Sequence, residues 1–177
     1  MDSHDISYEL ALPSDIEGIF ALALKYIPTQ FSNAGPLLKA WTPKILRDHM
    51  NDSNSEIAVA RGSQGLIFGF SLVLIRNPFP YPCLYPDQSN IGTEWGSIEG
   101  FFVHPKMQRY EIVKGLMDKT ERILNRRGVK KAWLRVMQGD EPAQQSYEDH
   151  GYQKVERATT DKVFINDVMV KDIPKVL

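Results

Sequence analysis

The most constraining feature of the sequence is a strand, a helix and a second strand that follow one another between Ser97 and Met137. The strands are SIEGFFV (97–103) and KKAWLRVM (130–137), and Gly128 ends the helix between them as a left-handed cap. Seven positions of the helix recur on one face: Ile112, Val113, Leu116, Met117, Thr120, Ile123 and Leu124. Such a unit forms a right-handed crossover between parallel strands, so the chain must contain a sheet with a parallel pair.

The flanking segments predict antiparallel strands and further helices. Residues 56–61 and 66–76 are rich in β-forming residues, and the GSQG between them indicates a hairpin. Thr42 before a proline predicts the N-cap of a helix to Met50, and Ser14 with Glu17 predicts a capping box for an earlier helix. The expected order is β-α-α-β-β-β-α-β-α-β, in a mixed sheet with helices on both faces.

Residues 161–173 supply the last strand, or two strands that meet around Asn166 and Asp167. The 177 residues predict one domain over 1–177, and the net charge of -1 argues against nucleic acid as a partner. The longest mostly apolar run, 65–75, is too short to span a bilayer, and the first residues show no signal pattern. With a single cysteine, Cys83, these points favour a cytoplasmic protein without a membrane partner.

The junction from Val103 to Met117 is a candidate anion site. A helix N-terminus leaves backbone amides unpaired and carries a partial positive charge, which together bind a pyrophosphate. Gln108, Arg109 and Lys114 supply further donors. A junction of this kind is a weak signal by itself, because most of them bind nothing.

Two side chains suit proton transfer. Tyr147 follows the strand 130–137, on a helix that Asp140 can cap, and a phenol can donate a proton to a leaving thiolate. The alternative is that Tyr147 only packs its ring. Glu99 lies within an apolar strand, where a carboxylate needs a partner or has the raised pKa of a general base for an amine. The alternative is an edge-strand glutamate that faces water.

The histidines and the loop aromatics are weaker candidates for a site. The four histidines (His4, His49, His104 and His150) are scattered without metal-ligand spacing, so no metal is expected. The long loops 27–41 and 77–95 carry aromatic residues that could line an acceptor pocket or pack in the core or an interface. These aromatics are Phe31, Trp41, Phe79, Tyr81 and Tyr85.

Together these features resemble the GCN5-related N-acetyltransferase (GNAT) family. FFVHPKMQRYEIVKGLM is similar to its Val-x-Pro-x-x-(Gln/Arg)-x-x-Gly-x-(Gly/Ala) acetyl-CoA motif through Val103, Pro105 and Gln108. The two glycines of that motif fall on Glu111 and Val113, so the pyrophosphate loop is degenerate.

A second motif of the family, Asn-x-x-Ala-x-x-x-Tyr-x-x-x-Gly-(Phe/Tyr), resembles DEPAQQSYEDHGY. The match runs through Ala143, Tyr147, Gly151 and Tyr152, with Asp140 in place of the asparagine. Within the family, IEGFFV and EPAQQSYEDHG look closest to the diamine (spermidine/spermine) acetyltransferase branch. The resemblance implies an α/β (α+β) fold with a mixed, mainly antiparallel sheet of six to seven strands. A central parallel, splayed strand pair and helices on both faces complete the implied fold.

The resemblance also implies an activity. The chain would be an N-acetyltransferase that moves an acetyl group from acetyl-CoA, its co-substrate, to a primary amine of a small molecule. The acceptor would be a polyamine or an amino-bearing metabolite, and a homodimer would fit the family's habit. Glu99 would take the ammonium proton, and Tyr147 would protonate the thiolate. The implied acetyl-CoA contacts are Phe101, Phe102, Val103, Gln108, Arg109, Tyr110, Glu111, Ile112, Val113, Lys114, Asp140, Ala143 and Ser146.

A competing interpretation keeps the fold and changes the function. Side chains at Glu111 and Val113 crowd the approach of a pyrophosphate, and Glu111 adds a negative charge. On this interpretation the chain has lost or changed its use of acetyl-CoA. It would then be a binding or scaffold protein, or would run different chemistry.

Overall fold

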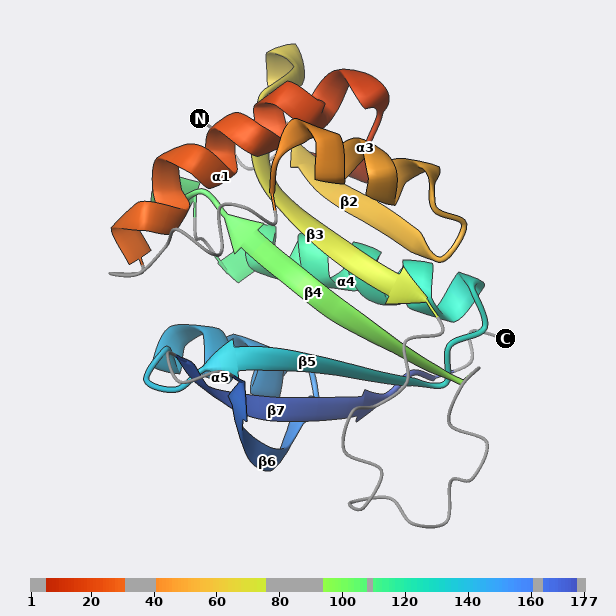
Figure 1. Cartoon of the computed structure of the whole chain (residues 1–177), viewed down its shortest axis with the longest axis vertical. Coiled ribbons are helices and arrows are strands. Elements are labelled where there is room, and N and C mark those ends of the chain that lie inside the picture. The colour runs from red at the N-terminus through yellow and green to blue at the C-terminus, as the bar shows by residue number, and fades with distance from the viewer. Residues whose placement is uncertain (1–5, 31–40, 76–93, 108–109, 161–163, 175–177) are drawn as a thin grey trace. The chain divides into compact units, whose positions relative to one another are not determined.

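A computed structural model describes residues 6–30, 41–75, 94–107, 110–160 and 164–174. The chain divides into two compact units (Figure 1). The first comprises Met1–Leu72 with Gly100–Thr120, and the second comprises Val73–Glu99 with Glu121–Leu177. Strand β4 and helix α4 each contribute residues to both units. The single domain expected from the sequence stays a prediction.

Seven strands form one sheet in the order β1-β2-β3-β4-β5-β7-β6. The strands are β1 (Ser7–Leu10), β2 (Ser55–Arg61), β3 (Ile67–Ile75), β4 (Trp95–Val103), β5 (Lys131–Met137), β6 (Gln153–Thr160) and β7 (Phe164–Asp172). The described helices are α1 (Ile16–Gln30), α3 (Pro43–Asn51), α4 (Tyr110–Arg126) and α5 (Glu141–Asp149), with short 3-10 turns at Pro13–Asp15, Ser63–Gly65 and Pro105–Met107. The mixed, mainly antiparallel sheet with one parallel pair, β4 and β5, confirms the predicted fold class.

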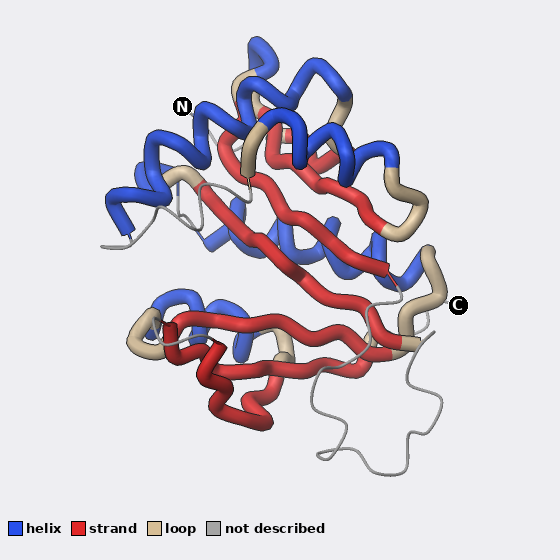
Figure 2. Tube along the Cα trace, viewed as in Figure 1, coloured by secondary structure: helices blue, strands red, loops and turns tan. Residues whose placement is uncertain are grey.

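In the first unit, helices lie on both faces of the strands. The consecutive residues Gly69 and Phe70 of β3 point to opposite faces. The Phe70 ring contacts Trp41, just before α3, edge-on at 4.9 Å between centroids. A Cβ atom added at Gly69 would instead touch the side chain of Leu116 in α4. Figure 2 shows the same arrangement, with α1 and α3 on one side of these strands and α4 on the other.

The structure confirms several predicted helix caps and the predicted turn between β2 and β3. The Thr42 hydroxyl accepts a hydrogen bond from the Ile45 amide at 3.4 Å and caps α3. In the short connection between β2 and β3, Gln64 and Gly65 have φ values of 67° and 77°. Gly128, with φ of 76°, ends α4 as the predicted left-handed cap.

The predicted capping box of Ser14 and Glu17 is wrong. The 3-10 turn before α1 is instead closed by Asp15, whose carboxylate accepts from the Leu12 amide at 2.6 Å. Asp15 is buried, and the guanidinium of Arg61 in β2 contacts both of its oxygens. Asp15, which is paired with a residue distant in the sequence, therefore fixes the start of the helix. The sequence pattern had predicted a cap formed only by neighbouring residues.

In the second unit, β5 lies between β4 and β7. The parallel ladder to β4 runs from Trp95↔Lys131 to Ile98↔Leu134, so it occupies only the first half of β4. The antiparallel ladder to β7 continues along the whole of β5, from Lys131↔Asp172 to Met137↔Asn166. The short parallel ladder agrees with the strand pair that the family resemblance implied.

Strand β6 is an element that the sequence prediction lacked. Four of its eight residues are Gln153, Lys154, Glu156 and Arg157, a composition that gives little strand signal. It pairs with β7 at the edge of the sheet, with a register shift between Lys154 and Glu156. Strand β7 runs without a break through 166–167, so the alternative of two strands there is wrong.

Candidate functional site

The end of β4 directs backbone amides away from β3. The His104 amide donates to the Phe68 carbonyl of β3 at 2.7 Å, and the ring of Phe102 stacks on a phenylalanine of β3. Because backbone groups alternate along a strand, the N–H of Phe102 also points toward β3. The N–H groups of Phe101 and Val103 therefore point to the opposite edge of β4.

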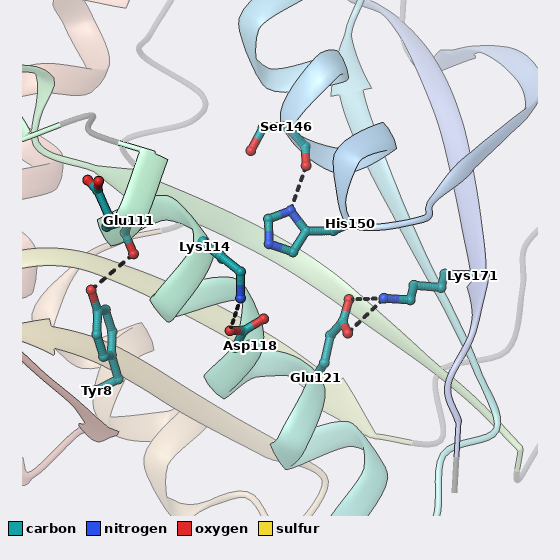
Figure 3. Close-up of polar contacts among 8 residues, drawn as sticks. All are labelled: Tyr8, Glu111, Lys114, Asp118, Glu121, Ser146, His150 and Lys171. Atoms are coloured by element: carbon teal, nitrogen blue, oxygen red, sulfur yellow. Dashed lines mark hydrogen bonds and ion pairs between the residues drawn. The ribbon is translucent and has the colours of Figure 1, made fainter. Parts of the chain in front are cut away.

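Tyr8 of β1 braces the first turns of α4 (Figure 3). Its hydroxyl donates to the carbonyl of Glu111 at 3.3 Å. A Cβ atom added at Gly115 would overlap the Tyr8 ring, so this close approach requires glycine. Burial, and then the negative charges of Glu111 and Asp118, raise the pKa of the Tyr8 hydroxyl. Tyr8 thus remains a hydrogen-bond donor across the neutral pH range.

The two residues that the family resemblance places at the motif glycines differ in their surroundings. The Glu111 side chain is exposed, whereas Val113 is half-buried. Between them, the Ile112 side chain is buried in the core, so only its backbone is placed to meet a ligand. Lys114 forms an ion pair with Asp118 at 2.7 Å, one turn along the same helix (Figure 3).

Other predicted cofactor and acceptor residues are only partly placed. Tyr110 is the first residue of α4. Trp41 is buried against Phe70, and a Cβ atom added at Gly100 would overlap its ring, so Trp41 is a core residue. The residues that fall outside the described ranges are Gln108, Arg109, Phe31, Phe79, Tyr81, Tyr85 and Cys83.

Glu99 lies in the second unit, one residue beyond the parallel ladder, and two side chains of the described residues contact its carboxylate. The Ser97 hydroxyl donates to Oε1 at 2.7 Å, and Nη2 of Arg135 lies 3.3 Å from Oε2. The Glu99 side chain is 21% exposed and that of Arg135 is 38% exposed. The Glu99 carboxylate is therefore hydrogen-bonded and ion-paired, while it and the Arg135 guanidinium both remain accessible to solvent.

Arg135 is a residue of this site that sequence reasoning missed. Its guanidinium lies over the ring of Trp133, 5.9 Å from the centroid. The sequence feature that could have indicated Arg135 is an arginine within the otherwise apolar segment LRVM. This segment belongs to the strand that follows the Glu99 strand in the chain. Only the parallel register, in which Ser97 faces Trp133, shows that Glu99 and Arg135 share a face.

Helix α5 is built as the sequence predicted. The Asp140 carboxylate accepts from the Ala143 amide at 3.2 Å and caps the helix, and Gly151 follows it with φ of 84°. Ser146 has its carbonyl 2.7 Å from Nδ1 of His150, one turn later (Figure 3). The motif residues Ala143 and Ser146 are half-buried on this helix.

Tyr147 of α5 is buried, with its ring edge-on to Tyr152 at 6.0 Å. Burial, with a smaller contribution from the charge of Asp140, raises the pKa of the Tyr147 hydroxyl well above its ordinary value. The phenol therefore keeps its proton at neutral pH. The same shift makes it a weaker acid than a free tyrosine, so burial holds the proton on the hydroxyl more tightly.

The described residues contain neither a cluster suited to a metal ion nor a helix suited to span a membrane. Across these ranges, no group of three or more His, Cys, Asp or Glu side chains is arranged to hold a metal ion. Among the helices placed by the structure, none has the length and apolar character to cross a membrane.

Solved acetyltransferase structures share this fold. Ard1 from Thermoplasma volcanium matches with a TM-score of 0.71 and 15% identity, over 97% of this chain and 99% of its own. The ribosomal-protein-S18-alanine N-acetyltransferase from Escherichia coli matches with a TM-score of 0.69 and 15% identity, over 97% and 96%. The PaiA N-acetyltransferase from Thermoplasma acidophilum, in complex with coenzyme A, matches with a TM-score of 0.71 and 14% identity, over 94% and 98%.

Sequence comparison gives the family. No curated protein matches the chain by sequence. The family model for the acetyltransferase (GNAT) family matches residues 26–152, which is well over half of the 177 residues. The chain therefore belongs to the acetyltransferase (GNAT) family.

Proposed function

We propose that the protein is an N-acetyltransferase that transfers the acetyl group of acetyl-CoA to a primary amine of a small molecule. The observation that carries the proposal is the Glu99 carboxylate, which is fixed by Ser97 and Arg135 at the point where the β4–β5 ladder ends. Membership of a family of acyltransferases supports it. A polyamine and an amino-bearing metabolite are the two acceptor classes to distinguish.

The proposed reaction divides its proton transfers between two residues. The acceptor ammonium loses a proton to the Glu99 carboxylate, and the amine nitrogen attacks the thioester carbonyl. The new C–N bond forms as the C–S bond breaks, and the thiolate takes a proton from the Tyr147 hydroxyl. The ammonium nitrogen loses two protons in all, the first through Glu99 and the second after the C–N bond forms. Tyr147 takes up one proton to replace the one it gave to the thiolate. One proton is therefore released to solvent per turnover.

Acetyl-CoA binding would use backbone groups of the first unit. The N–H groups of Phe101 and Val103 point away from β3 and suit the thioester end of the ligand, as the alternation of β4 indicates. The first turn of α4 offers amides and a partial positive charge to the diphosphate. The PaiA structure, solved with coenzyme A, has the same fold and supports the use of this co-substrate.

Glu111 should weaken this binding without preventing it. A unit charge about 6 Å from a phosphate charge, at an effective dielectric near 20, repels it by roughly 3 kcal/mol. Because the Glu111 side chain is exposed, screening by water and salt makes the real penalty smaller. We therefore expect Glu111→Gln to tighten acetyl-CoA binding by about tenfold in Kd, equivalent to about 1.4 kcal/mol.

Calorimetric titration of both proteins with acetyl-CoA measures this effect. Glu17→Gln is the matched control, since Glu17 is an exposed acidic residue in the first turn of α1. Equal affinities for the wild type and both variants would show that Glu111 does not face the diphosphate.

The overall proposal is tested by thiol release from acetyl-CoA with a panel of primary amines. The panel contains polyamines, α-amino acids and amino sugars, and product acetylation is confirmed by mass spectrometry. Turnover with at least one amine is expected. No turnover with any amine, together with an unchanged melting temperature on adding CoA, would overturn the proposal.

A second candidate function is a binding protein that has lost acetyl-CoA. The presence of Glu111 and Val113 at the two motif glycines favours it. The calorimetric titration separates the two candidates, because micromolar affinity for acetyl-CoA would reject the loss of the co-substrate. Absence of binding to both the wild type and Glu111→Gln would favour the binding protein.

A further inference from the structure

We propose that Arg135 makes the protein select acceptors that carry a carboxylate beside the reacting amine, such as free α-amino acids, over polyamines. This inference rests on the proposed function and names its acceptor class. It follows from the side chains that surround Glu99 in the second unit.

Glu99 and Arg135 present opposite charges side by side. The parallel register places Ser97 opposite Trp133, and the next residues on the same face are Glu99 and Arg135. Their charged atoms are 3.3 Å apart, and both side chains are partly exposed. A free α-amino acid carries an ammonium and a carboxylate on one carbon. It can therefore place its ammonium against Glu99 and its carboxylate against Arg135 in a single orientation.

The guanidinium of Arg135 is suited to this role by its geometry. It lies over the Trp133 ring, 5.9 Å from the centroid, in a cation–π contact that favours this position of the side chain. An arginine has five N–H donors in a planar fork, and a carboxylate is their preferred bidentate partner. The contact to Glu99 is a single long one, through Nη2. The fork can therefore accept a second carboxylate without leaving Glu99.

The charges that β4, β5 and β7 place on this face do not favour a polyamine. On this face of β4, β5 and β7 in the second unit, the described charged residues are Glu99, Arg135, Lys131 and Asp172, two of each sign. Lys131 and Asp172 pair with one another at 2.9 Å. A polyamine needs an excess of negative charge to hold its several cations, and Arg135 would repel the ammonium nearest to Glu99.

Matched acceptors test the inference. The common α-amino acids are screened first, and each active one is compared with its own carboxamide, which keeps the amine and removes the charge of the carboxylate. Putrescine and spermidine represent the polyamines. For the wild type, we expect kcat/KM to be at least about tenfold higher for the acid than for the carboxamide, as loss of a charge-assisted bidentate contact implies.

Variants of Arg135 assign the preference to this side chain. Arg135→Gln is expected to bring the acid-to-carboxamide ratio close to one, and Arg135→Glu to shift the preference toward diamines. Arg135→Lys keeps the charge without the fork, so an intermediate ratio is expected. Arg122→Gln, an exposed arginine on α4, is the control and should leave the ratio unchanged.

The ratio of kcat/KM for the acid to kcat/KM for the carboxamide separates a change in selectivity from a structural effect. A variant that merely disturbs Glu99 lowers turnover for the acid and the carboxamide alike, and so leaves their ratio at the wild-type value. Such an outcome, or a wild type that acetylates acids and carboxamides equally, overturns this inference while the acetyltransferase proposal stands. A wild type that acetylates no amine at all overturns the acetyltransferase proposal itself.

Discussion

Two arginine–carboxylate pairs in this protein are built in opposite ways. In the first unit, Asp15 is 4% exposed, Arg61 contacts both of its oxygens, and the Leu12 amide adds a third contact. In the second unit, Glu99 and Arg135 share one 3.3 Å contact and remain partly exposed. Burial and a bidentate geometry make the first pair a fixed part of the fold. The second pair is looser and more exposed, so its charged groups can accept a further partner.

The largest expected effect breaks the buried pair. Arg61→Gln leaves the Asp15 carboxylate buried without its counter-charge, so the free energy of unfolding should fall by about 3 kcal/mol. Urea unfolding followed by circular dichroism measures the change. The control is Arg47→Gln, because the pair of Arg47 with Glu17 is exposed and 3.6 Å long, and its loss should cost less than about 0.5 kcal/mol. Similar losses for both variants would contradict the distinction.

The next effect concerns the carboxylate of the looser pair. Glu99→Gln keeps the size of the side chain and removes the proposed base, so kcat should fall by about 100-fold or more while the melting temperature stays nearly constant. Thiol release and a thermal melt measure the two quantities. The exposed Glu148→Gln on α5 serves as the control. A full loss of kcat accompanied by a large loss of stability would place Glu99 with Asp15 as a structural residue.

A pH titration of stability sharpens the comparison. Burial alone would raise the pKa of the Asp15 carboxyl, but hydrogen bonds from Arg61 and Leu12 and the charge of Arg61 outweigh it, and the pKa is lowered. The folded state then binds this proton more weakly than the unfolded state. The stability from Asp15 is thus complete above the unfolded pKa of about 3.9, and it is lost as the pH falls through the folded pKa.

Asp15→Asn removes this titration. Urea unfolding between pH 5 and pH 2.5 should therefore show a shallower loss of stability for the variant than for the wild type. Replacement of an exposed aspartate, Asp48→Asn, should keep the wild-type slope. Equal slopes for the wild type and Asp15→Asn would show that other carboxyl groups account for acid unfolding.

The smallest expected effect is on the stability of Arg135→Gln. A single contact between partly exposed groups contributes little, so the free energy of unfolding should change by less than about 0.5 kcal/mol. The same urea experiment measures it. A loss comparable to that of Arg61→Gln would mean that the two pairs are equivalent in the fold, and that Arg135 is needed for structure.

The same contrast explains what the sequence could predict. Helix caps could be predicted from the sequence, as Thr42, Gly128 and Asp140 show, because the groups that interact in a cap lie a few residues apart. The capping box at Ser14 was wrong because the decisive partner of Asp15 is 46 residues distant. Strand β6 was missed because an edge strand needs few apolar residues and so leaves a weak pattern.

The candidate site follows the same rule. Glu99 was predicted as a candidate site residue, since a carboxylate within an apolar strand can be recognised from the sequence alone. Its partner Arg135 is 36 residues away on another strand, and only the register between the strands brings the two together. Residues that act through pairing across a sheet are therefore the part of a site that local patterns omit.

The contact of Tyr8 with Gly115 has a practical consequence for recombinant work. It ties β1 to a helix about a hundred positions later in the sequence, so a variant or fusion that displaces β1 would also disturb the first turns of α4. Ligand titrations made with an amino-terminal fusion should therefore be repeated after its proteolytic removal.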